Sequence, residues 1–250
     1  VAGAAIATVI GQFSAASLAF VLFKKYNTHL HISFKKFRVD FHVISQLYSI
    51  AIPSSVMMCL PSILVSLLNG ILSSISQSAV AFFGVYYKLQ TFIYMPTSGI
   101  VQGMRPLMSY NYGAKLKERM HQILKVSGLA IATILGLGTL LFFMIPDILL
   151  SLFNASSGML EIGETGLRIL SLSFIVSSFG VLMSGVFEAL GLGKYSLIVS
   201  LLRQLLITVP LAYILLNVMG IEGIWLSFVI AEAIASIVAY ILYRKKFKTI

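Results

Sequence analysis

The chain of 250 residues is 58% hydrophobic and only 10% charged, whereas a typical soluble domain has about 25% charged residues. A soluble fold of this length cannot bury so much apolar surface, so the composition excludes the soluble classes and indicates an integral membrane protein. A single cysteine, Cys59, excludes an intrachain disulfide and a cysteine-built metal site, and the net charge of +10 raises the question of nucleic-acid binding.

Seven apolar runs are each long enough to cross a bilayer as a helix, which takes about 20 residues. The breaks between the second and third runs and between the sixth and seventh are very short, so these pairs are predicted to form antiparallel hairpins. The runs are unbroken and lack the alternation of a membrane β-barrel. The sequence therefore predicts an all-α polytopic membrane protein with seven transmembrane helices. The predicted helices are residues 1–23, 43–75, 79–104, 124–146, 166–190, 196–219 and 221–243.

The first ten residues, "VAGAAIATVI", contain no Met, no charged segment and no small-residue cleavage site. They are therefore not interpreted as a signal peptide. We expect this stretch to come from the interior of a longer protein.

Basic residues gather in every second connection between the predicted helices, where 16 of the 18 Lys and Arg residues lie. The positive-inside rule places these connections in the cytoplasm, with the start of the chain outside and its C-terminus inside. The net charge is thus interpreted as membrane topology, and no nucleic-acid partner is expected. The basic connections hold Lys24, Lys25, Lys35, Lys36, Arg38, Arg105, Lys115, Lys117, Arg119, Lys125, Lys194, Arg203, Arg244, Lys245, Lys246 and Lys248; the others hold Asp147, Glu161, Glu164, Glu222 and one basic exception, Arg168.

Motifs of enzyme chemistry are missing from the sequence. It has no H-E-x-x-H, no G-x-S-x-G and no pair of aspartates within the predicted helices. The histidines, His29, His31, His42 and His121, lie in or beside basic segments, where contact with water or headgroups is expected. We therefore expect no enzyme activity, no catalytic residue and no metal site.

Few charged residues lie within the predicted helices, and a charge costs roughly 2.5–3.5 kcal/mol at the bilayer centre. Lys88 and Glu232 are predicted at similar depth near mid-membrane, and Glu188 and Arg203 at similar depth nearer the cytoplasm. Each pair is interpreted either as a structural ion pair or as part of a polar path for substrate or protons. With Gln90, these residues are the candidates for a substrate or ion pathway.

Prolines interrupt several predicted helices. Pro53, Pro61, Pro96 and Pro210 each remove a backbone hydrogen bond and are predicted to kink their helices. Four kinks among seven predicted helices are typical of a protein whose helices bend during function, although a static bundle also tolerates them.

The segment "LQTFIYMPTSGIVQGMRPLMSYNYGAK" resembles the signature of the multidrug and toxic compound extrusion (MATE) transporters. Three further blocks, "GAAIATVIGQ", "FEALGLGKYSLIVSLLRQ" and "GIWLSFVIAEAIASIVAYIL", resemble the sixth helix of that family, its tenth-to-eleventh helix junction in the bacterial drug-efflux branch, and its last helix. By this resemblance residues 102–120 form a cytoplasmic loop after helix eight. The residues that carry it are Gln102, Pro106, Tyr110, Asn111, Tyr112 and Gly113.

The resemblance implies the C-terminal half, helices six to twelve, of a twelve-helix transporter with two six-helix bundles around a cavity. Such a protein lies in the bacterial cytoplasmic membrane and exchanges H⁺ or Na⁺ for amphipathic, often cationic, drugs, with no other cofactor. The expected partners are membrane lipids, small amphipathic drugs or metabolites, and the N-terminal half of the same protein. The implied parts are residues 1–23, the last helix of the N-terminal bundle; 24–42, a basic cytoplasmic linker; 43–243, the C-terminal six-helix bundle; and 244–250, a basic cytoplasmic tail.

The chain departs from the family where some members carry a second coupling acid. Pro61 stands where such an acid lies on helix seven, and Ser177 and Ser178 stand in the middle of helix ten. The coupling acid of many bacterial members lies in the first bundle and so is not expected in this chain.

Two other functions remain open. Related transporters flip lipid-linked precursors or polysaccharides and line their cavity with several basic residues, whereas here only Lys88 and Arg203 are available. A non-transporting membrane scaffold is the second alternative, against which the charges and prolines within the helices argue.

Overall fold

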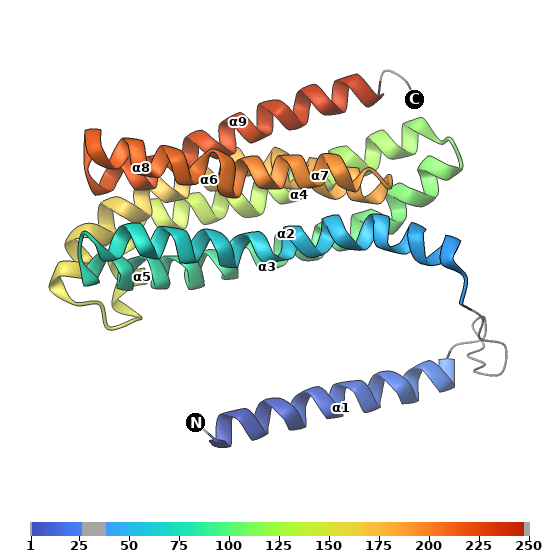
Figure 1. Ribbon diagram of the computed structural model, residues 1–250, viewed down its shortest axis with the longest axis horizontal. Coiled ribbons are helices and arrows are strands. Elements are labelled where there is room, and N and C mark those ends of the chain that lie inside the picture. The colour runs from blue at the N-terminus through green and yellow to red at the C-terminus, as the bar shows by residue number, and fades with distance from the viewer. Residues whose placement is uncertain (1, 27–38, 248–250) are drawn as a thin grey trace. The chain divides into compact units, whose positions relative to one another are not determined.

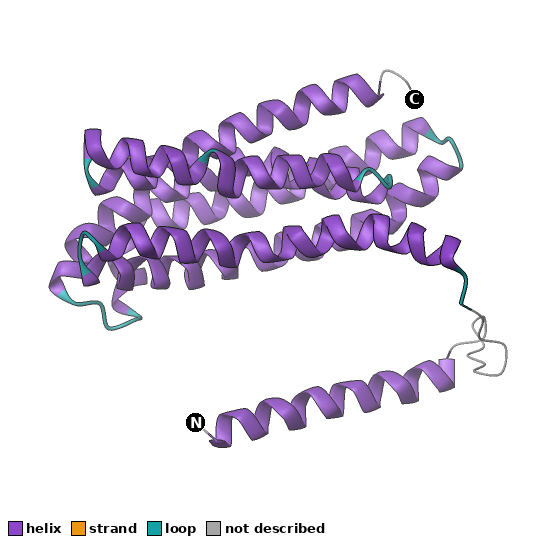
Figure 2. Cartoon of the chain, in the orientation of Figure 1, coloured by secondary structure: helices purple, strands orange, loops and turns teal. Residues whose placement is uncertain are grey.

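The computed structural model describes residues 2–26 and 39–247, and within these ranges every regular element is a helix (Figures 1 and 2). The backbone divides into two units, residues 1–45 and 46–250, and the second is called the bundle below. Much of the predicted basic linker, residues 27–38, and the end of the predicted tail, 248–250, lie outside the described residues. The helices are α1 (Ala2–Tyr26), α2 (Phe41–Ser73), α3 (Gln77–Gly113), α4 (Lys117–Met144), α5 (Pro146–Ser151), α6 (Ser157–Ala189), α7 (Gly193–Leu201), a π-helical segment (Leu202–Leu206), α8 (Thr208–Met219) and α9 (Ile221–Phe247).

The prediction of an all-α membrane protein is confirmed. Six stretches of the described helices are long and apolar enough to cross a membrane. The third predicted span is also helical, as α3, but this helix runs 37 residues and carries more polar side chains. The six stretches are Ala5–Tyr26, Phe41–Ser73, Lys117–Met144, Ser157–Ala189, Gly193–Met219 and Ile221–Lys246.

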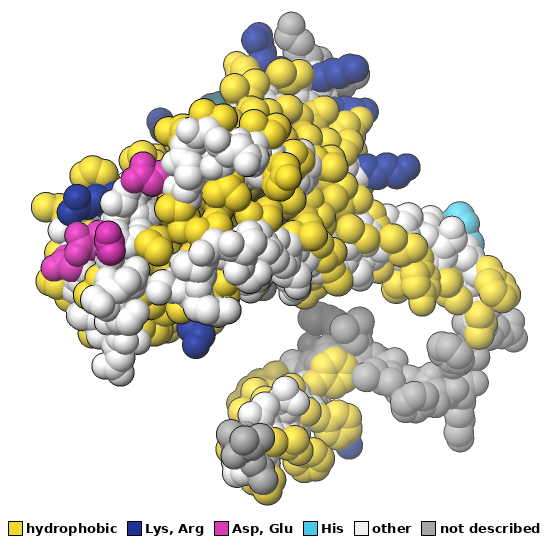
Figure 3. All heavy atoms as spheres, turned by 60° about the vertical axis from the view of Figure 1, so that its left-hand side comes forward, with side chains coloured by type: hydrophobic (Ala, Val, Ile, Leu, Met, Phe, Trp, Pro, Cys, Tyr) yellow, Lys and Arg dark blue, Asp and Glu magenta, His cyan; other side chains and the backbone are white. Residues whose placement is uncertain are grey.

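Apolar side chains cover much of the visible surface of the bundle in Figure 3, and acidic side chains gather at one end. In water such a surface would be unfavourable by roughly 25 cal/mol for each Å² of apolar area. Its place is in lipid, which is itself apolar, so this exterior fits the composition of the chain.

Helix α6 organises the core of the bundle, because it packs against α3, α4 and α9. Phe82 of α3 meets Trp225 of α9 edge to face, with ring centroids 5.1 Å apart. Gly166 of α6 makes room for this pair, since a Cβ atom there would lie 2.6 Å from the Phe82 ring. Helices approach closely in membranes where small residues face their neighbours, and this contact is an example.

The signature residues form the end of α3 and not the loop that the sequence predicted. The helix continues past Pro106 to Gly113, and the following turn has Lys115 in the left-handed conformation, at φ 58°. The amide of Leu116 donates to the carbonyl of Asn111 at 2.9 Å, and the Asn111 side chain donates to Leu107 O at 2.8 Å. The prediction is wrong because the change from apolar to charged residues does not end the helix, which continues outside the apolar layer to Gly113.

The sixth predicted span, 196–219, is also not a regular helix. A π-helical segment, Leu202–Leu206, separates α7 from α8, and Ile207 N donates to Leu202 O at 3.1 Å. The Thr208 hydroxyl donates to Arg203 O at 2.5 Å and so satisfies a carbonyl beside the irregular turn. Pro210 lies just beyond and lacks the amide that would bond to residue 206, which favours irregularity at this place.

Candidate functional site

A cleft of about 290 Å³ opens within the bundle between α2, α3, the π-helical segment and α9. It is called the polar cleft here, because hydroxyl, amide and charged groups line it together with aromatic rings. Its lining residues are Pro61, Leu64, Tyr87, Gln90, Thr91, Tyr94, Met95, Ser98, Arg203, Gln204, Phe228 and Glu232.

An ion pair forms one wall of the polar cleft. Arg203 Nη2 lies 3.1 Å from Glu232 Oε1, and these side chains are only 16% and 11% exposed. Glu232 Oε2 and Arg203 Nε are buried and have no hydrogen-bond partner among the described residues. Each charged group therefore keeps one unsatisfied polar atom inside the bundle, which is costly, while other atoms of the pair border the cleft.

The polar residues on α3 line up along one face of the helix. Tyr87, Thr91, Tyr94 and Ser98 follow at steps of three or four residues, which is the spacing of a single helical face. The hydroxyl oxygens of Tyr94 and Ser177 lie 2.7 Å apart in a hydrogen bond, so α6 holds the Tyr94 ring in place. The opposite wall comes from α9 and from the π-helical segment, which carries Arg203 and Gln204.

A second ion pair ties the C-terminal end of α6 to α3. Arg105 Nη2 lies 2.6 Å from Glu188 Oε2, and the Ser196 hydroxyl on α7 donates to Glu188 Oε1 at 3.0 Å. The Ser109 hydroxyl donates to Ala189 O at 2.5 Å nearby. These contacts join three helices at the turn between α6 and α7, and they lie outside the polar cleft.

Both predicted charge pairings are wrong. Glu232 pairs with Arg203 and Glu188 pairs with Arg105, whereas Lys88 is exposed on α3 and forms no ion pair within the described ranges. Depth along the membrane was the only criterion available from the sequence. It says nothing about which way a side chain points around its helix axis.

The remaining candidates divide between several places. Gln90 and Pro61 line the polar cleft, whereas Pro96 lines a separate apolar groove between α3 and α4. Pro53 is buried in α2 and Pro210 is exposed on α8. The predicted kinks at Pro53, Pro61 and Pro96 remain predictions, because α2 and α3 run through these prolines as helices.

Several residues of the polar cleft were missed from the sequence. The signal that would have found Tyr87, Thr91, Tyr94 and Ser98 is their helical spacing within an otherwise apolar run. Gln204 follows Arg203 in "LLRQLL", where two polar residues interrupt four leucines.

Comparison with known proteins gives one family. The MatE family model matches residues 53–214. The "Multidrug export protein MepA" of Staphylococcus aureus (strain bovine RF122 / ET3-1) is 26% identical over 242 residues, which is 97% of this chain and 53% of the relative. The protein of the same name from Staphylococcus saprophyticus is 24% identical with the same coverage. The chain thus spans about half the length of the curated relatives it matches.

Solved structures show the same fold. An outward-facing multidrug resistance MATE family transporter of the MOP superfamily aligns with a TM-score of 0.85 at 22% identity, over 95% of this chain and 54% of that one. A MOP superfamily transporter from Pyrococcus furiosus aligns with a TM-score of 0.84 at 20% identity, over 94% and 54%. The family resemblance of the signature blocks is confirmed by a family model that covers more than half of the sequence. The chain belongs to the MatE family.

Proposed function

We propose that the chain is the C-terminal half of a secondary active multidrug exporter in the bacterial cytoplasmic membrane. The complete protein exchanges H⁺ or Na⁺ for amphipathic, often cationic, compounds, while two bundles rock against each other. Family membership supports this proposal, as do relatives named as multidrug export proteins that are about twice as long. No enzyme activity and no bound cofactor belong to it, and the C-terminus lies in the cytoplasm.

The polar cleft carries the proposal. The Glu232 carboxylate and the rings of Tyr87, Tyr94 and Phe228 line the same space. Aromatic faces attract organic cations by about 0.5–2 kcal/mol each, and a carboxylate adds attraction that is strong in a medium of low dielectric constant. A cation in the cleft therefore competes with Arg203 for Glu232, which gives a means of coupling its binding to the state of the ion pair.

The flippase alternative is less well supported by the same cleft. Binding of lipid-linked phosphates favours several basic residues, and Arg203 is the only Lys or Arg among the cleft residues that the structure describes. Its charge is offset by Glu232 at 3.1 Å. A scaffold without transport activity would have no use for an open cleft beside unsatisfied buried charge.

Dye efflux tests the proposal, with the chain co-expressed with the N-terminal half of the transporter in cells that lack other pumps. A cationic dye is expected to be exported by the two halves together and retained when either is absent. Gln90→Leu, which leaves the ion pair intact, is expected to lower efflux, whereas Glu161→Gln, an exposed charge at the start of α6, leaves it unchanged. Ion-gradient-dependent efflux by this chain alone would contradict the two-bundle proposal.

The two alternatives give other outcomes in the same cells. Accumulation or export of a lipid-linked phosphate without dye efflux would favour the flippase. Normal dye efflux in Gln90→Leu would remove the polar cleft from the pathway, and a failure of both halves to move any dye at normal protein levels would favour the scaffold. The amount of each variant in the membrane is measured, so that loss of protein is not mistaken for loss of transport.

A further inference from the structure

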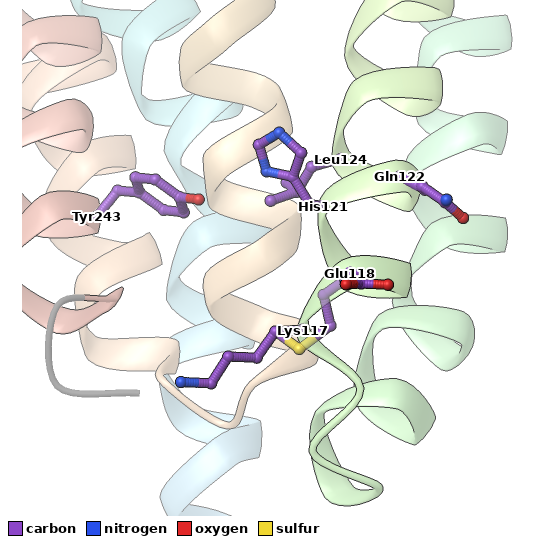
Figure 4. A pocket seen from close by; sticks show the side chains of 7 residues that line it. Lys117, Glu118, His121, Gln122, Leu124 and Tyr243 are labelled. Atoms are coloured by element: carbon purple, nitrogen blue, oxygen red, sulfur yellow. The ribbon is translucent and has the colours of Figure 1, made fainter.

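A second pocket, of about 610 Å³, lies at the end of the bundle where α4 begins and α9 ends. It is separate from the polar cleft and plays no part in the proposed pathway. Helix α6 packs against both α4 and α9, and the pocket occupies the space that these two helices leave beside it (Figure 4). Its lining residues are Lys117, Glu118, Met120, His121, Gln122, Leu124 and Tyr243.

Cationic and hydrogen-bonding groups line the mouth of this pocket. Lys117 and His121 are one turn apart on α4, and Figure 4 shows both reaching toward the side of Tyr243 on α9, while Gln122 extends to the other side of α4. The Lys117 ammonium and the His121 imidazole both carry N–H groups that can donate to an acceptor at the mouth. This arrangement suits a phosphate, which presents several strong acceptor oxygens.

The wider charge at this end of the bundle has the same sign. The last turn of α9 carries Arg244, Lys245 and Lys246. Helix α4 has 28 residues and points its N-terminus, the positive end of its dipole, toward the pocket mouth, with no side-chain cap on it. Glu118 is the one acid of the lining and is outnumbered by these charges.

The floor of the pocket is apolar. Met120 and Leu124 follow Lys117 and His121 along α4 and are 3% and 9% exposed. A hydrophilic anion would fill only the mouth and leave the floor empty. A molecule with a phosphate and a hydrocarbon chain would satisfy both parts.

We propose that this pocket binds an anionic phospholipid of the surrounding membrane. The headgroup phosphate lies against Lys117, His121 and Tyr243, and an acyl chain extends along Met120 and Leu124. The basic end of a membrane protein lies at the headgroup level, where such a lipid is available without leaving the bilayer. The bound lipid then fills the space between α4 and α9 and holds the two helices against α6.

Native mass spectrometry of the purified chain in detergent tests this binding. The chain is titrated with phosphatidylglycerol and, separately, with phosphatidylcholine of the same acyl chains. Phosphatidylglycerol is expected to bind the more tightly, and Lys117→Gln is expected to weaken its binding about fivefold, since one basic residue contributes about 1 kcal/mol to the attraction of anionic lipid. Lys117→Arg keeps the charge and is expected to retain the affinity.

Arg119→Gln is the matched control, because it removes the same charge in the same turn of α4 from a residue that does not line the pocket. It is expected to leave the affinity for phosphatidylglycerol unchanged. An equal loss in this control would show diffuse attraction in place of a site. Equal binding of phosphatidylcholine, or displacement of the lipid by soluble glycerol phosphate at the same concentration, would also overturn the proposal. Lys117 is exposed, so its replacement leaves the core intact.

Discussion

Removal of one member of the Arg203–Glu232 pair is expected to destabilise the bundle strongly. At 3.1 Å and an effective dielectric constant of about 20, the two charges attract by about 5 kcal/mol. Most of that attraction offsets the cost of burying them, so the pair as a whole contributes little. A single replacement, however, leaves an unpaired charge in the interior and costs about 3–5 kcal/mol.

The assay is a thermal midpoint, measured by size-exclusion chromatography of the detergent-solubilised chain after heating. Glu232→Met and Arg203→Met are each expected to lower the midpoint by roughly 6–20 °C, taking about 2–4 °C for each kcal/mol in a chain of this size. The double variant is expected to recover most of this loss, because no charge is then left unpaired. Additive losses in the double variant would refute the reasoning.

Lys88→Met provides the control for the pairing. Lys88 is exposed, so its replacement alone is expected to leave the midpoint unchanged. Combined with Glu232→Met, it is expected to give no recovery. Recovery by this combination would mean that Lys88, and not Arg203, is the partner of Glu232.

Three further predictions concern packing and orientation. Arg105→Gln removes the partner of Glu188, and because these side chains are 39% and 21% exposed the loss is expected to be only about 1 kcal/mol, measured as a fall of the same midpoint. Gly185→Ala places a Cβ atom 2.5 Å from Val101 Cγ1 and is expected to cost about 1–3 kcal/mol, whereas Gly103→Ala meets nothing within 4 Å and should not lower the midpoint; equal midpoints for the two would contradict the close contact. Single cysteines on a cysteine-free background are expected to react with an impermeant reagent from outside at Ser76 and Leu160, and only from inside at Lys117 and Lys246. Labelling of position 117 from outside would reverse the orientation.

The helical fold was predictable because the bilayer sets both the length and the composition of a spanning segment. An apolar run of about 20 residues has few alternatives in a membrane, where a helix satisfies all of its own backbone groups. The ends of the helices were less predictable, as α3 shows. Its last turns lie beyond the apolar run, where local turn geometry around Lys115, and not hydrophobicity, determines the end.

The sequence predicted some members of the candidate site but none of its contacts. Arg203, Glu232 and Gln90 were singled out because polar groups are rare inside a membrane, and all three line the polar cleft. Their partners depended on the rotation of each helix about its axis. For Arg203 that rotation includes the π-helical segment, whose start no residue pattern in "LLRQLLITVP" marks.

The π-helical segment has a consequence for insertions and deletions. A π turn holds one residue more than an α turn, so a single deletion within 202–206 restores an α turn and leaves the flanking helices in phase. Thr208 and Ala212, both fully buried, would then still face the core. Helix α9 has no such extra residue. A single deletion in its middle therefore turns one end of the helix by about 100° relative to the other. Ala235 and Ala239 would leave the core, so the chain is expected to tolerate a lost residue at Leu205 far better than one at Ile234.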